Sequence, residues 1–178
     1  GVHYCELCDG HMYQDKVIAV MGGGNAAVDA ANFLTKYASK LLLIHRSQLK
    51  ADTVSQERLK KNDKATICLN TEIKALHGDG KLETVTVLDK TTGKEQEVAV
   101  DGIFVNIGVI PNTELFKGQV EMDESGRIIA GEDCRTNLPG VFAAGDVRVK
   151  EIRQLTTAAA DGTTAALLAE QIARSEER

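Results

Sequence analysis

Two cysteines near the start of the chain, Cys5 and Cys8, are separated by two residues and followed at once by an acid, Asp9. Thiols at this spacing can close a small disulfide, exchange it with another disulfide, or bind a metal ion. In a redox pair one thiolate attacks a disulfide, the other resolves the mixed disulfide, and an acid protonates the departing thiolate. Because Asp9-Gly10 is also a common turn dipeptide, Asp9 has two interpretations, an acid or a turn residue.

A zinc site would need two more ligands at suitable spacing. Cys68 and Cys134 form no second pair of this kind, and His3 and His11 only flank the first pair. Cys68 lies in a strand-like run and Cys134 in a polar loop, so we interpret both as packing residues. The redox interpretation is favoured and no metal site is predicted, while a zinc-stabilised interaction domain stays open as an alternative.

A glycine-rich segment follows a short apolar run at residues 17–21 and precedes a helical stripe over 27–38. It fits the G-x-G-x-x-G/A pattern of a dinucleotide-binding turn. Gly22 would permit the tight turn, Gly24 would let the backbone approach a pyrophosphate, and the helix N-terminus would face the anion. A plain tight turn is the other interpretation. The predicted dinucleotide contacts in this segment are Gly22, Gly24, Asn25, Ala26 and Ala27.

A second continuous apolar run, at 41–44, is typical of a parallel strand covered on both faces and completes a strand–helix–strand unit. About 20 residues after such a glycine turn, an acid would bind the ribose of NAD. This chain has no acid there before Asp52, whereas Arg46 and Lys50 could bind a 2′-phosphate or simply form a solvated basic turn. NADPH is therefore favoured over NADH.

The remaining pattern predicts an α/β fold, a Rossmann-like parallel sheet with an inserted antiparallel meander. The meander would cover one face of the sheet, and residues 108–112 would form a domain crossing. The expected elements are a helix at about 52–61, a strand around Cys68, the meander at 72–101, a strand at 103–106, a hairpin at 120–130 and an alanine-rich helix from about 153 to 173.

Composition supports a folded protein that binds neither nucleic acid nor membrane. The 178 residues are 43% apolar and 26% charged, with a net charge of −5 and no basic cluster for phosphate binding. No stretch approaches the roughly 18 apolar residues of a membrane span. No signal peptide is visible, and four cysteines do not make a disulfide scaffold, so we expect a cytoplasmic protein.

Several motifs in order resemble bacterial-type, low-molecular-weight thioredoxin reductases. They are the Tyr4–Gly10 dithiol segment, Gly22–Asn25, Ile44-His45-Arg46, Gly140–Asp146 and Arg153-Gln154. The flavoprotein subunit of alkyl hydroperoxide reductase is a near relative and an alternative. Two segments are similar to that branch, Leu49–Asp52 and Asp101–Val105.

The resemblance implies that electrons pass from NAD(P)H to FAD, to the Cys5–Cys8 disulfide and then to thioredoxin or a thioredoxin-like protein, in a homodimer. Cys5 would attack the partner, Cys8 would face the flavin and Asp9 would be the acid. Asp146 would bind the FAD ribityl chain. Where NADPH-dependent members carry a second arginine, this chain has Ser47. Beyond the glycine segment, the implied cofactor-binding residues are His45, Arg46, Ser47, Lys50, Ile107, Gly108, Gly145, Asp146, Val147, Arg153, Gln154 and Leu155.

The resemblance also implies two parts, an NAD(P)H-binding domain with the dithiol at 1–108 and the C-terminal segment of an FAD-binding domain at 109–178. A complete reductase begins with its own glycine turn for FAD, whereas this chain starts at the dithiol. We therefore expect a fragment that binds a nicotinamide dinucleotide but contacts FAD only in part and turns over little. A non-catalytic dinucleotide-binding module that senses redox state is a further alternative.

Overall fold

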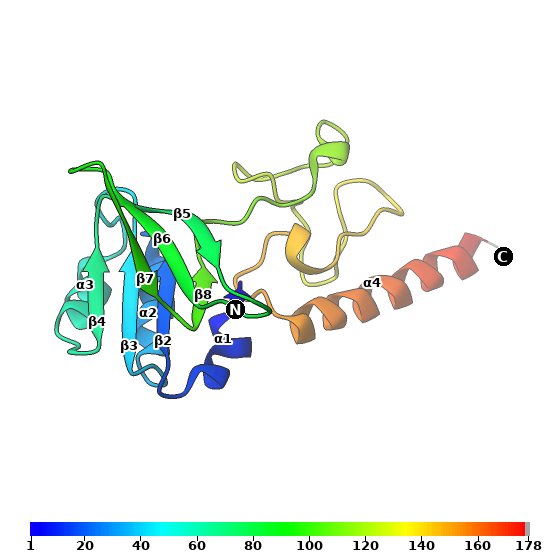
Figure 1. Ribbon diagram of the computed structural model, residues 1–178. Helices are drawn as coiled ribbons and strands as arrows, with labels where there is room; N and C mark the ends of the chain where they lie inside the picture. The colour runs from blue at the N-terminus through cyan, green and yellow to red at the C-terminus, as the bar shows by residue number, and fades with distance from the viewer. Residues whose placement is uncertain (177–178) are drawn as a thin grey trace. The chain divides into compact units, whose positions relative to one another are not determined.

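The computed structural model describes residues 1–176, so the last two residues of the predicted second domain, 177 and 178, lie outside the described part. The chain divides into two compact units, Gly1–Gly108 and Val109–Arg178. Figure 1 labels the helices and strands.

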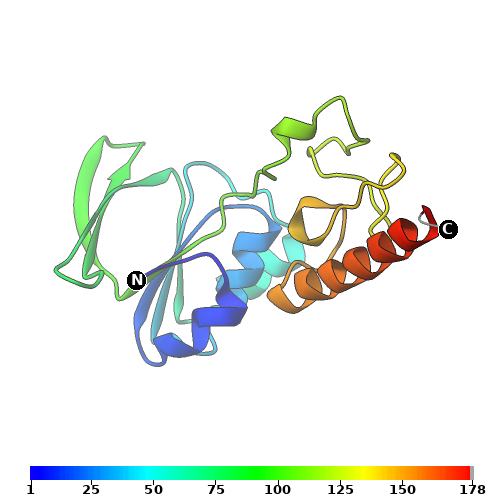
Figure 2. The ribbon, with the colours of Figure 1, turned by 90° about the vertical axis from the view of Figure 1, so that its right-hand side faces the viewer.

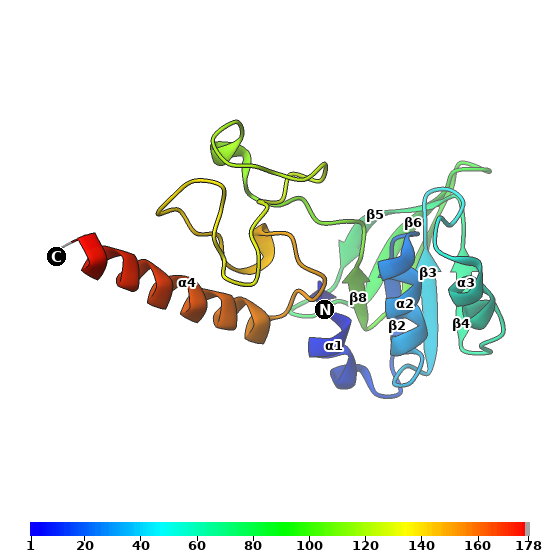
Figure 3. The same ribbon diagram turned by 180° about the vertical axis from the view of Figure 1, so that it is seen from behind.

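The first unit is built on a five-stranded parallel sheet with the order β1-β8-β2-β3-β4. Its strands are β1 (Val2–His3), β2 (Val17–Met21), β3 (Lys40–Ile44), β4 (Ala65–Cys68) and β8 (Gly102–Val105). Helices α2 (Asn25–Leu34) and α3 (Thr53–Lys60) lie on one face, as Figure 3 shows from behind. A separate antiparallel sheet lies on the other face, which makes three layers in Figure 2. Its strands are β5 (Thr71–His77), β6 (Thr84–Asp89) and β7 (Lys94–Ala99). The predicted α/β class is confirmed.

Burial on both faces explains why the central strands are continuous apolar runs. Successive side chains of a strand point to opposite faces. Ile18 and Leu41 accordingly pack with α2 in one buried cluster, whereas Ala19 and Leu42 pack in a second cluster with Val85 of β6. The predicted meander therefore covers the sheet, as expected, over residues 71–99.

Three details of this unit differ from the sequence-based expectation. Helix α2 ends at Leu34, although the apolar stripe runs on to Ala38, because Ala38 is fully buried from the turn that leads into β3. Strand β1 and the short helix α1 (Glu6–Asp9) were not predicted. The dithiol segment continues as the 3-10 turn η1 (Gly10–Tyr13), whose Tyr13 reaches the core.

Up to residue 176, the second unit consists of loops, two 3-10 turns and one long helix. The elements are η2 (Glu114–Phe116), η3 (Gly145–Val147) and α4 (Leu155–Glu176). The predicted hairpin at 120–130 is reduced to one antiparallel bridge, Met122 to Ile128, and Ile128 also pairs with Arg148 in a parallel bridge. Four apolar residues form the buried cluster in the described part of this unit, Val120, Ile128, Ala130 and Ala143.

Helix α4 starts at Leu155, two residues later than predicted. The Thr157 hydroxyl accepts a hydrogen bond from the Gln154 N–H at 3.2 Å, which caps the first turn. Arg153 and Gln154 therefore precede the helix rather than belong to it. Within residues 1–176, no helix is both long enough and apolar enough to cross a bilayer.

Candidate dinucleotide cleft and redox dithiol

A cleft of about 610 Å³ lies at the carboxyl ends of β2, β3 and β8. The chain leaves β2 toward β3 on one side and returns to β8 on the other, so the cleft occupies the topological switch point of the sheet. Ligands of open α/β sheets bind at such points. The predicted residues that line the cleft are Gly22, Gly24, Asn25, Ala26, His45, Arg46, Ile107 and Gly108.

Gly22 and Gly24 are needed in the turn for different structural reasons. Gly22 has a positive φ of 147°, and a Cβ there would lie 2.3 Å from the carbonyl oxygen of Asn106 and 2.7 Å from Cβ of Ala27. Gly22 and the fully buried Ala27 thus permit close packing of strand and helix. Gly24, the residue before α2, has an ordinary φ of −88° and no atom within 4 Å of a Cβ position. Its missing side chain leaves the helix N-terminus open, as a pyrophosphate requires.

We expect Gly24→Ala to weaken binding of a nicotinamide dinucleotide at least about tenfold, because the new methyl would occupy space that the phosphate backbone needs. The variant should keep the thermal stability of the parent chain, since nothing stands within 4 Å. Isothermal titration with NADPH and a thermal melt measure the two quantities.

Gly22→Ala is the matched comparison. Its methyl group would meet backbone and Cβ atoms well inside contact distance, so this variant should lose stability as well as binding. Equal NADPH affinity in Gly24→Ala and the parent chain would contradict the role given to Gly24.

The basic residues after β3 lie only partly at the cleft. Arg46 is exposed and lines it, whereas Ser47 and Lys50 are exposed outside the lining. The Lys50 N–H donates to the carbonyl of Gly23 at 2.7 Å, which ties this loop to the glycine turn. Burial, then Arg46 and Lys50, lower the pKa of His45. The imidazole is therefore neutral at pH 7, and the positive charge at this end comes from Arg46 and Lys50.

Sequence reasoning missed several residues that line the cleft, of which Asn106 has the clearest chemistry. The side-chain oxygen of Asn106 is buried without a hydrogen-bond partner among the described residues, and Asn106 lines the cleft. Buried polar atoms normally have partners, so this acceptor suits a donor on a bound molecule. Its position directly after a parallel strand was the available signal, since such positions carry ligands in open sheets. Residues Thr71, Glu72 and Ile73 of β5 also line the cleft.

The dithiol segment places Cys8 and Asp9 on the short helix α1 and Cys5 at its N-cap. Cys5 and Cys8 are joined as a disulfide, and Cys5 precedes α1 with its sulfur accepting the Cys8 N–H at 3.2 Å. Cys8 is exposed and Cys5 is half-buried. The Asp9 carboxylate accepts a hydrogen bond from His3 Nδ1 at 2.9 Å. Within the described residues no group of three or more histidine, cysteine or acidic side chains could hold a metal ion.

The other two cysteines are not part of this site. Cys68 packs half-buried beside the second cluster of the first unit, and burial raises the pKa of its thiol. Cys134 is fully buried in the second unit, where its thiol donates to the carbonyl of Asp161 at 3.5 Å.

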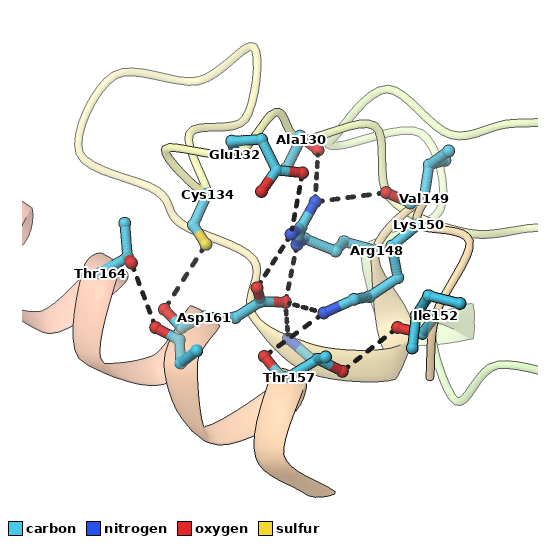
Figure 4. A network of polar contacts seen from close by, with 12 residues as sticks. Ala130, Glu132, Cys134, Arg148, Val149, Lys150, Ile152, Thr157, Asp161 and Thr164 are labelled. Carbon is cyan, nitrogen blue, oxygen red and sulfur yellow. Dashed lines mark hydrogen bonds and ion pairs between the residues drawn. The ribbon is translucent and has the colours of Figure 1, made fainter. Parts of the chain in front are cut away.

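In the second unit, the turn η3 consists of Gly145, Asp146 and Val147. Helix α4 holds this turn through the carboxylate of Asp161 (Figure 4). The Gly145 N–H donates to Asp161 Oδ2 at 2.9 Å. Asp146 itself is exposed. Arg153 Nε is buried without a partner among the described residues, and Leu155 is 86% exposed. The Arg153 Nε–H is thus a donor with which a polar group of a bound molecule could pair.

Two cations surround that carboxylate. Arg148 donates through Nε and Nη2 to the two oxygens of Asp161 at 2.8 and 2.9 Å, and Lys150 Nζ donates at 2.8 Å (Figure 4). The Arg148 hydrogen bonds, together with Lys150 and the Gly145 N–H, hold the pKa of Asp161 far below its usual range. The network fixes the turn that presents Asp146.

A parallel sheet with a glycine turn at its switch point is the arrangement of dinucleotide-binding α/β proteins, here with a dithiol on the same unit. The family model described as pyridine nucleotide-disulphide oxidoreductase matches residues 1–162, and the chain belongs to this family. The resemblance to thioredoxin reductases is also confirmed by the relatives below.

A Clostridium pasteurianum protein described as a 34.2 kDa protein in the rubredoxin operon is 48% identical over 171 residues, covering 96% of this chain and 56% of the relative. Thioredoxin reductase of Listeria innocua is 42% identical, covering 91% of this chain and 51% of the relative. The crystal structure of thioredoxin reductase from Streptococcus pyogenes matches with a TM-score of 0.92 and 37% identity, covering 98% of this chain and 58% of that one. The chain spans about half the length of the curated relatives it matches.

Proposed function

We propose that this chain is part of an NAD(P)H-dependent flavoprotein disulfide reductase of the thioredoxin reductase type. The observation that carries the proposal is the pairing, in one unit, of a dinucleotide cleft with a disulfide followed by an acid. Residues 1–108 bind the nicotinamide dinucleotide and carry the redox pair. Residues 109–178 contribute the C-terminal segment of the FAD-binding domain, consistent with the relatives named as thioredoxin reductases.

The chain's own residues have distinct tasks. The Cys5 thiolate attacks the partner disulfide, Cys8 resolves the mixed disulfide, and Asp9 protonates the departing thiolate. The Cys8 N–H, which already contacts the Cys5 sulfur, stabilises that thiolate. When bound, FAD supplies two-electron exchange between the nicotinamide and the disulfide. Asp146 and Arg153 would hold it, because one is exposed and the other has a buried donor without a partner.

Disulfide exchange tests this function without the flavin. The chain is reduced with a phosphine, separated from it, and mixed with oxidised thioredoxin. We expect stoichiometric transfer of two electrons, with Cys5–Cys8 reoxidised and thioredoxin reduced, measured by thiol labelling and mass spectrometry. A dithiol that never exchanges with thioredoxin would contradict the proposal.

The proposal also includes a homodimer in the cytoplasm, which sedimentation and cell fractionation of the whole protein would test.

For the nucleotide we propose NADPH over NADH, because Arg46 is exposed at the cleft and no carboxylate follows β3 there. Replacing Arg46 by alanine should weaken NADPH binding about tenfold and leave NADH binding nearly unchanged, since only NADPH has the 2′-phosphate.

The matched control is Arg58→Ala, which removes the same charge from the exposed end of α3. Titration calorimetry with both nucleotides gives the comparison. A loss of affinity shared equally by NADPH and NADH would argue against 2′-phosphate recognition by Arg46.

A further inference from the structure

His3 connects Asp9, the acid that follows the dithiol, with Tyr13. His3 Nδ1 lies 2.9 Å from Asp9 Oδ2, and Nε2 lies 2.6 Å from the Tyr13 hydroxyl. The ring stacks on Phe104 at 5.2 Å between centroids, and it meets Tyr13 edge-on at 5.2 Å. His3 and Phe104 are also paired across β1 and β8. With a side chain only 16% exposed, the imidazole is fixed in place.

Tyr13 decides which tautomer His3 adopts. Burial, then the charges of Asp9 and Asp101, raise the pKa of the Tyr13 hydroxyl, so it keeps its proton and can donate it to Nε2. The hydrogen of neutral His3 then sits on Nδ1 and donates to Asp9. With Asp9 ionised and His3 neutral, this is the assignment that satisfies both contacts.

The Asp9 carboxyl group is consequently held on one side only. Oδ2 accepts from His3, while Oδ1 has no hydrogen bond among the described residues. The side chain is 34% exposed, and Asp9 directly follows Cys8. Since Oδ2 already accepts a hydrogen from Nδ1, the protonated form of Asp9 carries its proton on the open oxygen, Oδ1.

We propose that His3 is a positioning residue for thiol–disulfide exchange, which holds Asp9 Oδ2 and so keeps the acid proton on Oδ1 for the departing thiolate. The inference rests on the proposed function of Cys5, Cys8 and Asp9. After Asp9 has given up its proton, the Nδ1–H still stabilises the carboxylate, which favours the transfer.

A disulfide substrate is reduced in two exchange steps. The Cys5 thiolate bonds to one substrate sulfur while the substrate S–S bond breaks, and that electron pair leaves with the second sulfur, which takes the proton from Asp9. The Cys8 thiolate then bonds to the Cys5 sulfur while the mixed S–S bond breaks. The first substrate sulfur leaves with that electron pair and takes a proton from solvent, which also returns a proton to Asp9. Over the cycle two cysteine thiols lose two electrons and two protons, and the substrate gains both as two thiols.

A pair of disulfides separates this role from a structural one. The alkyl thiolate from 2-hydroxyethyl disulfide is basic and benefits from an acid, whereas the thiolate from 4,4′-dithiodipyridine leaves readily without one. Both probes are uncharged near pH 8. The reduced 178-residue chain is mixed with each probe, and the second-order rate of exchange is measured.

Two substitutions of His3 form the test. His3→Phe keeps the stacking on Phe104 but removes both nitrogens, and His3→Asn keeps a donor near the position of Nδ1. We expect His3→Phe to react with the alkyl disulfide at least about tenfold more slowly, since general acids contribute about 10²–10⁴-fold. Its rate with the aryl disulfide should stay within about twofold, and His3→Asn should recover most of the alkyl rate.

The control is His11→Asn, which removes an exposed histidine from the same segment. It should match the parent chain with both probes. The inference fails if His3→Phe exchanges normally with the alkyl disulfide, or if both probes slow equally, as a merely structural change would cause. Failure of the proposed function is distinct, because the parent chain itself would then exchange with neither probe.

Discussion

Replacing Cys8 by serine is expected to stop disulfide exchange halfway and leave the partner covalently attached to Cys5. The Cys5 thiolate can still attack, but no second thiol remains to resolve the mixed disulfide. We expect release of fully reduced thioredoxin to fall at least about 10³-fold, because nucleophile and resolving group act as a unit. Non-reducing electrophoresis and mass spectrometry detect the adduct, which a small dithiol should release.

Cys5→Ser should show the same loss without the adduct, since the attacking thiol is gone. The double variant should be no slower than either single variant, because effects within one unit do not add. Cys68→Ala is the control for the loss of a thiol, since this half-buried cysteine has a raised pKa and should exchange at the parent rate without it. Trapping by Cys5→Ser in place of Cys8→Ser would reverse the two assignments.

The local patterns of the first unit were sufficient to predict the four longer strands of its parallel sheet, but not β1. The runs at 17–21 and 41–44 are apolar at every position because α2 covers one face of the sheet and β5–β7 cover the other. The glycine turn could also be predicted, because its glycines and Ala27 recur at a fixed spacing within six consecutive residues. At Gly22 the steric need is a positive φ beside the carbonyl of Asn106, and at Gly24 it is open space.

Contacts between distant parts of the sequence could not be predicted from local patterns. Strand β1 has only two residues and exists because it pairs with β8, about a hundred positions later. That pairing brings His3 over Phe104 and toward Asp9, so the sequence alone gave no reason to connect His3 with the acid. Asp161 is a similar case, because its partners precede it by 11 to 16 residues in irregular loops.

Replacing Asp161 by asparagine is expected to destabilise the second unit by about 3–5 kcal/mol, the usual cost of removing one partner from a buried ion pair. The side chains of Arg148 and Lys150 are 3% and 8% exposed, and their charges would lose the carboxylate that compensates them. Hydrogen–deuterium exchange of the α4 amides measures this loss within the unit.

Asp133→Asn is the matched control, because Asp133 pairs with Arg135 on the surface, where both side chains are about half exposed. It should change stability by less than about 1 kcal/mol. Similar exchange rates of α4 in the Asp161 and Asp133 variants would show that the buried network contributes little.

The ion pairs of Asp161 with Arg148 and Lys150 also lead us to expect that acid destabilises the second unit. Because Arg148 first, with Lys150 and the Gly145 N–H, lowers the pKa of Asp161 in the folded chain, the carboxylate stabilises the fold above its unfolded pKa of about 3.9. That stabilisation is lost as the pH falls below about 4 toward the folded pKa, since the unfolded chain then binds the proton first. Asp161→Asn should lack this component of the pH dependence while Asp133→Asn retains it. Because Asp161 also holds Gly145, the loss should loosen the turn that presents Asp146 and thereby weaken the surface proposed to bind FAD.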